Sequence, residues 1–460
     1  MSSPELKEFC GVTAIYSAKA DAAPLTHRAL FALQHRGQES AGIVTIDDGG
    51  RLHQLRARGL VTEALPLPRV CKLPGRRAIG HVRYSTVAAD RAENVQPFLA
   101  STPYGEIAVA HNGNIKNAAE LAGELRQAGS ILSTTMDTEL LVHLLARSGA
   151  PELGSALQQV AGRAIGAYSL TILCAGRLYG LRDAHGLRPL VLGELGAGGW
   201  VLASETCALD ALGARLVREV APGELIEIGP AGVHSRQLLP PAKVPTPCVF
   251  ELVYFARPDS IVFGQNAQAA RTRMGEQLAQ QDQELDGCMP PVDLVVPVPD
   301  SGIPAAIGYA RVSGIPYERA ILRSHYFGRT FILPTHDARA QGVRLKLSVN
   351  RELVAGKRLL LVDDSLVRGN TARELVRMVR EAGALEVWLR VASPPLRWPC
   401  YLGIDMPSRQ ELIINAHGDE AGVRDHVGVD NLRYLSEERL RRATGNAAAC
   451  LACMNGSYPL

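Results

Sequence analysis

The stretch from Lys357 to Ala384 constrains the fold more than any other part of the chain. It reads KRLLLVDDSLVRGNTARELVRMVREAGA. Leu359 to Val362 is a continuous apolar run, which is typical of a strand whose two sheet faces are both covered. From Asn370 the apolar residues follow helical spacing, and Gly383 is a natural helix stop. Strand, loop and helix in this order predict a parallel α/β sheet.

A proline-rich stretch, Leu238 to Pro247, divides the chain into two parts. It holds four prolines in ten residues, and proline favours a linker because it fixes φ and lacks an N–H donor. A chain of 460 residues also exceeds the usual size of one hydrophobic core, so we expect two domains. After the linker, Val292 to Gly314 repeats the strand–loop–helix order. Before it come short β-like runs and a helical stretch, at Ile107–Ala110, Tyr168–Cys174, Trp200–Ala203 and Asp137–Ala146.

Two adjacent carboxylates, Asp363 and Asp364, follow the apolar strand and precede a turn of small and hydroxyl residues. Ligands of open α/β sheets bind beyond the carboxyl ends of the strands, where a helix N-terminus is an anion site. The pair can hold a hydrated Mg²⁺, or the hydroxyls of a ribose, beside a phosphate. The plainer alternative is a helix N-cap with solvated acids, because acids are common at helix starts.

The whole string from Leu361 to Thr371, LVDDSLVRGNT, resembles the phosphoribosyl pyrophosphate signature of type I phosphoribosyltransferases, and among them of amidophosphoribosyltransferases. The resemblance implies that Asp363 and Asp364 contact the ribose and Mg²⁺. Pro299-Asp300-Ser301 resembles the family's pyrophosphate loop, which places Ser301 in the metal shell. The residues implied to wrap the 5′-phosphate are Ser365, Arg368, Gly369, Asn370 and Thr371.

A basic stretch from Arg323 to Arg351 contains a single acid, Asp337. Its simplest explanation is a solvated basic face. However, Tyr326 to Phe331, YFGRTF, resembles a flexible loop of the same family that closes over the pyrophosphate. The resemblance implies that Arg329 and Lys346 bind phosphoribosyl pyrophosphate. Closure would exclude water, which competes with ammonia for the anomeric carbon.

The first part of the chain carries a second set of motifs. Cys10-Gly11-Val12 is followed by LQHRGQESAG, HVRYST, HNGN and Asp137-Thr138-Glu139. In order and spacing these resemble the class II glutamine amidotransferases of the N-terminal-nucleophile fold. The fold expected is therefore an αββα glutaminase sandwich, followed by a type I phosphoribosyltransferase domain with a parallel sheet: α+β, then α/β.

The resemblance also implies the roles of the glutaminase residues. Cys10 is the nucleophile, and its own α-amino group, with a pKa of about 8, is the general base. The Asn112 side chain and the Gly113 N–H stabilise the oxyanion. Arg83 pairs with the α-carboxylate of glutamine, and Asp137 holds its α-ammonium group. That amine exists only if residues 1–9 are removed, so we expect cleavage between Phe9 and Cys10.

Nine cysteines without a secretory signal favour free thiols or metal ligands, and a cytoplasmic protein. The tail motif Cys450-Leu-Ala-Cys453 combines with Cys248 and Cys400 into a set of four, which suits a 4Fe–4S cluster or tetrahedral zinc. The surrounding strings resemble the iron–sulfur branch of the amidophosphoribosyltransferases, which implies a 4Fe–4S cluster. The other four cysteines are assigned to packing, the default for a free thiol: Cys71, Cys174, Cys207 and Cys288.

Together the motifs predict transfer of glutamine-derived ammonia to phosphoribosyl pyrophosphate, giving 5-phosphoribosylamine, pyrophosphate and glutamate, the first step of de novo purine synthesis. The resemblance further implies a homotetramer inhibited by purine nucleotides. A net charge of +3, 5% aromatic residues and the lack of a long apolar run argue against nucleic-acid or membrane binding. The expected segments are a propeptide 1–9, a glutaminase domain 10–240, a transferase domain 248–435 and a cysteine-bearing tail 436–460.

Three alternatives remain. Val87 to Asp90 stands where the family usually has glycine, so the chain could be a paralogue that uses free ammonia. A non-catalytic regulator could bind the sugar phosphate, although binding alone would not require the glutaminase motifs. A glucosamine-phosphate synthase-like enzyme would share only the first domain, and the VDDS string argues against it.

Overall fold

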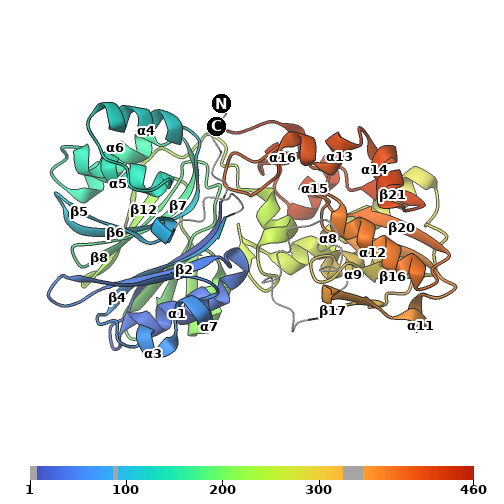
Figure 1. Ribbon diagram of the computed structural model, residues 1–460, viewed down its shortest axis with the longest axis horizontal. Coiled ribbons are helices and arrows are strands. Elements are labelled where there is room, and N and C mark those ends of the chain that lie inside the picture. Colours follow the sequence, from blue (N-terminus) through green and yellow to red (C-terminus); the bar gives the residue numbers. More distant parts are fainter. Residues whose placement is uncertain (1–7, 86–91, 325–344) are drawn as a thin grey trace.

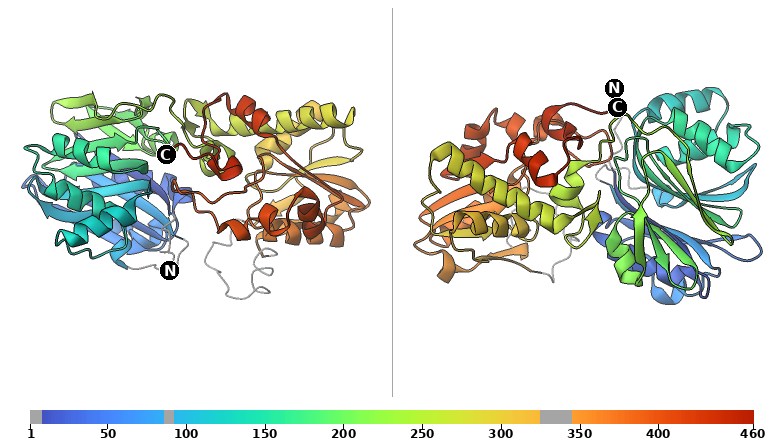
Figure 2. Two further views of the ribbon diagram at one scale, coloured as in Figure 1. Left: turned by 90° about the horizontal axis from the view of Figure 1, so that it is seen from above. Right: turned by 180° about the vertical axis from the view of Figure 1, so that it is seen from behind.

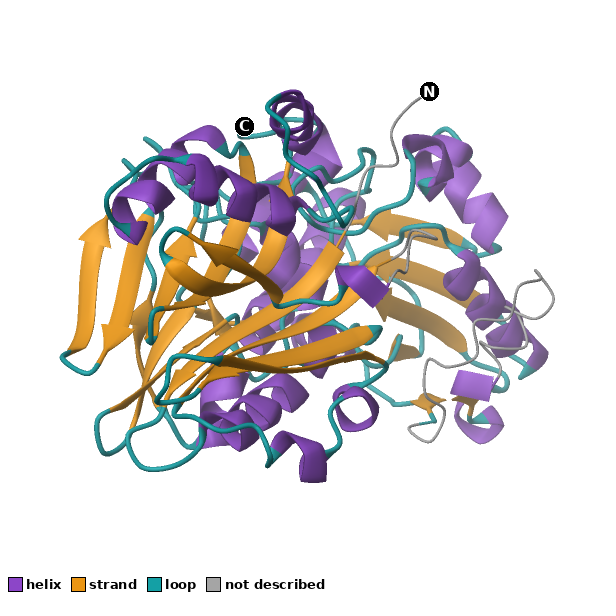
Figure 3. Ribbon diagram, turned by 60° about the vertical axis from the view of Figure 1, so that its left-hand side comes forward, coloured by secondary structure: helices purple, strands orange, loops and turns teal. Residues whose placement is uncertain are grey.

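The computed structural model describes residues 8–85, 92–324 and 345–460. Its first domain is built on two antiparallel sheets that face each other (Figure 1; Figure 3). The first sheet has the order β11-β9-β10-β1-β4-β2-β3, with β1 Glu8–Tyr16, β2 Ser40–Ile46, β3 Leu52–Arg58, β4 Arg77–Ser85, β9 Val191–Leu195, β10 Gly199–Ala203 and β11 Arg215–Glu219. The second has the order β13-β12-β8-β7-β6-β5, with β5 Phe98–Thr102, β6 Gly105–Ile115, β7 Gly166–Cys174, β8 Arg177–Arg182, β12 Glu224–Gly229 and β13 Gly232–Gln237.

Three hydrophobic layers hold this sandwich together. Between the sheets, Val12 and Ala14 of β1 pack with Ala108 and Ala110 of β6. Outside the first sheet lie α1 Ala22–Ala32, α2 Val61–Ala64, α3 Leu67–Val70 and α7 Thr206–Leu212. Outside the second sheet lie α4 Ala118–Gln127, α5 Asp137–Arg147 and α6 Leu153–Arg163. The αββα architecture is confirmed.

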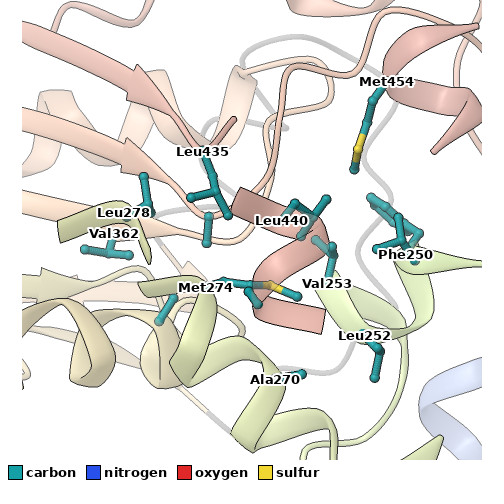
Figure 4. Close-up of a cluster of buried hydrophobic side chains, with 14 of the residues drawn as sticks. Phe250, Leu252, Val253, Ala270, Met274, Leu278, Val362, Leu435, Leu440 and Met454 are labelled. Carbon is teal, nitrogen blue, oxygen red and sulfur yellow. The ribbon is translucent and has the colours of Figure 1, made fainter. Parts of the chain in front are cut away.

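The second domain is centred on a four-stranded parallel sheet in the order β16-β19-β20-β21. Its strands are β16 Leu294–Pro297, β19 Arg358–Asp363, β20 Glu386–Val391 and β21 Asn431–Tyr434. One face packs on α8 Ala267–Asp286 and α9 Ile303–Ser313, and the other on α12 Asn370–Glu381 and α14 Glu420–Val427. Leu360 and Val362 enter the first of these cores, in which Figure 4 labels Val362, while Leu359 and Leu361 enter the second. This alternation explains the continuous apolar run.

Shorter elements complete the structure. These are η1 Gln34–Arg36, η2 Ala92–Asn94, η3 Glu251–Phe255, β14 Ile261–Val262, β15 Gln265–Asn266, β17 Ile321–Arg323, β18 Leu347–Val349, α11 Arg351–Val354, η4 Arg409–Glu411, α13 Ile413–Ala416, α15 Glu437–Thr444 and α16 Ala452–Asn455. The C-terminus returns to the first domain, where Lys116 Nζ donates to the Leu460 carbonyl at 2.8 Å (Figure 2). No helix in the described ranges is long and apolar enough to cross a bilayer.

The proline-rich stretch is not a free linker between the domains. Its backbone lies along the first domain, where the Ala242 N–H donates to the Ala184 carbonyl and the Thr246 N–H to the His185 carbonyl. Two of the four cysteines assigned to packing are buried, Cys174 and Cys207, but Cys71 and Cys288 are exposed. The packing assignment is wrong for those two, because each lies in a surface turn just after a helix end.

Candidate active sites

Cys10 is fully buried on β1, where it stands opposite Arg83 of β4. Its carbonyl oxygen accepts a hydrogen bond from Nε of Arg36 at 3.0 Å. Arg36 reaches this position because the next residue is Gly37: a Cβ there would lie 2.5 Å from the backbone nitrogen of Arg83. Only glycine allows η1 to lie this close to β4. The expected nucleophile and the expected carboxylate-binding arginine are therefore neighbours in one sheet.

The expected oxyanion group comes from the opposite sheet. Asn112 and Gly113 lie on β6, and Nδ2 of Asn112 is 3.5 Å from Oγ of Ser204. The same hydroxyl accepts the Val12 N–H at 3.0 Å, two residues beyond Cys10. Gly113 has φ +151°, and a Cβ there would lie 1.9 Å from the Ala167 carbonyl oxygen. Ser204, which sequence reasoning missed, thus joins the nucleophile strand to the oxyanion amide.

Asp137 is the first residue of α5 and is buried against β6. Its Oδ1 lies 3.0 Å from Nδ1 of His111, and its Oδ2 accepts the Ile115 N–H at 3.0 Å. Burial opposes its ionisation, but His111 and these hydrogen bonds outweigh burial and lower the pKa of Asp137. His81 of β4 lies 3.0 Å from the His111 carbonyl oxygen, and burial lowers the pKa of His81 to about 3.

The transferase residues gather at the carboxyl end of β19. The Asp364 N–H donates to Oδ1 of Asp363 at 2.9 Å, and Oγ of Ser365 donates to Oδ1 of Asp364 at 2.5 Å. Ser301, from the loop after β16, also hydrogen-bonds the Asp364 carboxylate. Burial, followed by the charge of Asp364, raises the pKa of Asp363 well above its usual value. Burial likewise raises the pKa of Asp364.

The expected phosphate loop leads directly into α12. Gly369 is the N-cap with φ +75°, a conformation that favours glycine, and Asn370 and Thr371 open the helix. Arg368 is half-exposed and paired with Glu411 at 3.1 Å. Lys346 lies at the base of the basic stretch, where its carbonyl accepts the Ser324 N–H. Arg329 lies outside the described residues, as do the lid segment Tyr326–Phe331 and the loop Val87–Asp90.

The four cysteines of the expected cluster come together from three parts of the chain. Cys248 and Cys450 form a parallel backbone bridge, and the Leu402 N–H donates to Sγ of Cys400 at 3.3 Å. Burial and the neighbouring cysteines raise the pKa of Cys453, and burial raises that of Cys248 to about 12 and that of Cys450 to about 11. Among the described residues, no three or more His, Cys, Asp or Glu side chains stand at metal-binding geometry.

A buried charge cluster between the domains was not predicted from the sequence. It consists of Arg36, Arg188, Glu205 and Glu251, each at most 1% exposed. Arg36 binds Glu251 through two hydrogen bonds, 2.8 and 3.0 Å long, and also pairs with Glu205. Arg188 pairs with Glu251 at 3.1 Å and donates to the Leu402 carbonyl. The only sequence signal was a charged residue within each of several apolar strings.

The fold and these sites define a two-domain enzyme, a class II glutaminase joined to a type I phosphoribosyltransferase. A family model described as "Glutamine amidotransferase domain" matches residues 81–211. The chain is 44% identical to Amidophosphoribosyltransferase 2, chloroplastic, of Arabidopsis thaliana, covering 99% of this chain and 80% of the relative. It is 45% identical to the amidophosphoribosyltransferase of Mycobacterium tuberculosis, covering 100% and 88%.

Solved structures of the same family also match this chain. "Structure of the allosteric regulatory enzyme of purine biosynthesis" matches with a TM-score of 0.91 and 43% identity over 98% of this chain and 96% of the other. Glutamine phosphoribosylpyrophosphate amidotransferase from B. subtilis, complexed with ADP and GMP, matches with a TM-score of 0.89 and 43% identity over 98% and 97%. The chain belongs to the amidophosphoribosyltransferase family, which carries out the first step of purine biosynthesis with glutamine as the ammonia donor.

Proposed function

We propose that this chain transfers ammonia from glutamine to phosphoribosyl pyrophosphate through the residues named above, giving 5-phosphoribosylamine, pyrophosphate and glutamate. The observation that carries the proposal is the presence of two complementary sites in one chain. Cys10 lies opposite Arg83 and across the sandwich from Asn112 in the first domain. The Asp363–Asp364 pair lies at a strand end beside a helix N-terminus in the second.

In the glutaminase half, removal of residues 1–9 gives Cys10 a free α-amino group. This amine takes the thiol proton, and the sulfur attacks the glutamine amide carbon. The resulting oxyanion is held by the Asn112 side chain and the Gly113 N–H. The C–N bond breaks, ammonia leaves with a proton from the amine, and water hydrolyses the thioester to glutamate. Arg83 and Asp137 hold the α-carboxylate and α-ammonium groups of glutamine.

In the transferase half, ammonia attacks the anomeric carbon and pyrophosphate leaves with the bonding electrons. The phosphate loop, Ser365 and Arg368 to Thr371, orients the 5′-phosphate at the start of α12. Arg329 and Lys346 bind the pyrophosphate side of the substrate. Uncharged ammonia is the nucleophile, so passage between the domains without release to water favours the reaction.

The acidic pair fits Mg²⁺. Two adjacent, largely buried carboxylates with raised pKa values repel each other, and a divalent cation relieves that repulsion. Asp363, Asp364 and Ser301 would hold the ion together with water. When bound, Mg²⁺ neutralises charge on the phosphates of the substrate.

The proposed ligands of a 4Fe–4S cluster are Cys248, Cys400, Cys450 and Cys453. Their residue type and their convergence from three parts of the chain support this, although the four thiols do not stand at metal-binding geometry in the described structure. Cys248 and Cys453 are buried, Cys400 and Cys450 are partly buried, and the N–H donated to Cys400 Sγ is also suited to cluster ligation. Tetrahedral zinc is the competing occupant. Metal analysis of protein purified without oxygen distinguishes them: about four iron and four sulfide per chain support the cluster, whereas one zinc per chain contradicts it.

The proposal also includes a homotetramer in the cytoplasm that is inhibited by purine nucleotides. One relative of 43% identity was solved with ADP and GMP. Sedimentation of the cleaved protein with and without these nucleotides tests the assembly. Loss of activity with either nucleotide, at saturating substrates, tests the inhibition.

The decisive experiment measures pyrophosphate and glutamate release without oxygen, with each substrate omitted in turn, on protein of recorded intact mass. Equal release of both products, only with both substrates and without residues 1–9, supports the proposal. A Cys10→Ala variant should lose activity with glutamine and keep it with ammonium chloride. Wild-type release with ammonia alone indicates an ammonia-using paralogue, and no release with either source indicates a regulator.

A further inference from the structure

Two consecutive residues, Ser204 and Glu205, lie where both domains meet the glutaminase site. They follow β10, and Glu205 is the N-cap of α7. Both side chains are fully buried. Ser204 faces the expected glutaminase site, because its hydroxyl accepts the Val12 N–H at 3.0 Å and lies 3.5 Å from Nδ2 of Asn112. One hydroxyl therefore fixes the nucleophile strand and the oxyanion amide relative to each other.

Glu205 faces the domain boundary. Its Oε1 pairs with Arg36 and lies 2.8 Å from Nε2 of His35, both in the glutaminase domain. Its Oε2 accepts from the transferase side, from Oγ of Ser260 at 2.6 Å and from the Arg257 N–H at 2.9 Å. A single carboxylate therefore ties the arginine that holds the Cys10 carbonyl to a segment of the other domain.

That transferase segment is anchored in turn on α8. Arg271 of α8 is buried and donates to the carbonyls of Leu252 at 2.9 Å and Ala256 at 2.7 Å, at the two ends of η3. The contacts thus run from this transferase segment through Glu205 and Arg36 to the Cys10 strand, and from that strand through Ser204 to Asn112.

Building on the function proposed above, we propose that Ser204 and Glu205 are positioning residues through which the transferase domain sets the geometry of the glutaminase. Ser204 aligns Asn112 with the Cys10 strand, and Glu205 holds Arg36 in place from Ser260 and Arg257. Such coupling through packed and hydrogen-bonded groups needs direct evidence, which a mutational cycle provides.

The main test variant is Ser260→Ala, because it lies outside the glutaminase and removes one hydrogen bond to a buried carboxylate. We expect the kcat of glutamine hydrolysis with phosphoribosyl pyrophosphate to fall about tenfold, the size expected for a hydrogen bond to a charged group. The KM for glutamine should change less than about twofold, and pyrophosphate release with ammonium chloride should be unchanged. The matched control is Ser17→Ala, a buried serine with one hydrogen bond, to the Ala20 N–H, at the far end of β1.

A cycle with Ser204→Ala separates positioning from general destabilisation. If both residues act along one path, the double variant Ser204→Ala/Ser260→Ala should lose little more than the more damaging single variant. Glu205→Gln should show the same loss of glutamine-dependent rate. If that variant does not fold, Ser204→Ala and Ser260→Ala still test the proposal.

Two results would overturn the inference. One is a Ser260→Ala enzyme whose kcat of glutamine hydrolysis with phosphoribosyl pyrophosphate equals that of Ser17→Ala. The other is an equal loss with glutamine and with ammonia, which marks a purely structural contact. Failure of the proposed function is distinct, since wild-type protein would then release no pyrophosphate with either nitrogen source.

Discussion

Oδ1 of Asp137 lies 3.0 Å from Nδ1 of His111, so the carboxylate expected to hold the glutamine ammonium group is tied to the strand that carries the oxyanion amide. Its second oxygen accepts the Ile115 N–H of the same strand. Asn112 and Gly113 lie between these two attachment points. The groups expected to bind the substrate and to stabilise the oxyanion therefore share one rigid support, in which a change at Asp137 also disturbs β6.

Asp137→Asn should weaken both functions of this support. Replacing the carboxylate removes its charge and one hydrogen-bond acceptor, so the free energy of unfolding should fall by about 1–3 kcal/mol at pH 7. The wild-type contribution is present above about pH 4 and is lost as pH falls through the lowered folded-state pKa. The KM for glutamine should rise at least about tenfold. Urea denaturation and steady-state kinetics measure these effects, and unchanged KM would contradict the assignment.

His81 should make the protein less stable in acid. The pKa of His81 is about 3 in the folded protein and about 6.5 in the unfolded chain. Between these two pH values His81 is therefore protonated only in the unfolded chain. Stability therefore falls as pH drops through this window, by about 1.4 kcal/mol per pH unit from this residue. His81→Gln should remove that slope, which urea denaturation at pH 6.5, 5.5 and 4.5 measures. Equal slopes in both proteins would show that His81 is not the cause.

Gly113→Ala should impair the glutaminase through a steric clash. The added Cβ would lie 1.9 Å from the Ala167 carbonyl oxygen, so β6 and β7 must separate at the oxyanion group. We expect at least about a hundredfold loss of glutamine-dependent kcat, as for loss of an oxyanion donor. The control is Gly129→Ala, also at positive φ but with open space around it. Equal losses in the two variants would mean that backbone strain alone is responsible.

Asp363→Asn should stabilise the metal-free protein while abolishing its activity. The raised pKa of Asp363 means that its ionised form is costly in the fold at pH 7, so removing the charge should add about 1 kcal/mol to the free energy of unfolding. Mg²⁺ should raise the melting temperature of the wild type but not of the variant. Asp293→Asn is the control: that carboxylate is paired with Arg358 and should bring no gain. The prediction is contradicted if Asp363→Asn and Asp293→Asn both stabilise the protein, or if neither does.

The sequence alone predicted the local architecture of the transferase site well. The apolar run Leu359–Val362 proved to be the centre of β19, and the helix begins at Asn370 as its periodicity indicated. These signals are local, because strand burial, helix spacing and turn chemistry all act within about a dozen residues. The motif order likewise predicted a glutaminase followed by a phosphoribosyltransferase.

Other features depended on residues that are distant in the sequence. The linker's attachment to the first domain, the exposure of Cys71 and Cys288, and the Ser204–Asn112 contact had no local signal. Arg36 meets Glu205 across 169 positions and Glu251 across 215. The sequence shows that these charged residues are present, but not which of them pair in the fold.

The sequence by itself determined which groups are available for chemistry: the Cys10 thiol, the Asn112 amide, an acidic pair at a strand end and four further cysteines. Only the tertiary structure decided how the two halves are joined, through Arg36, Glu205 and Ser260. The physical reason is that a charge can be buried only with a partner in place, and that partner is supplied by the packing of whole domains rather than by neighbouring residues.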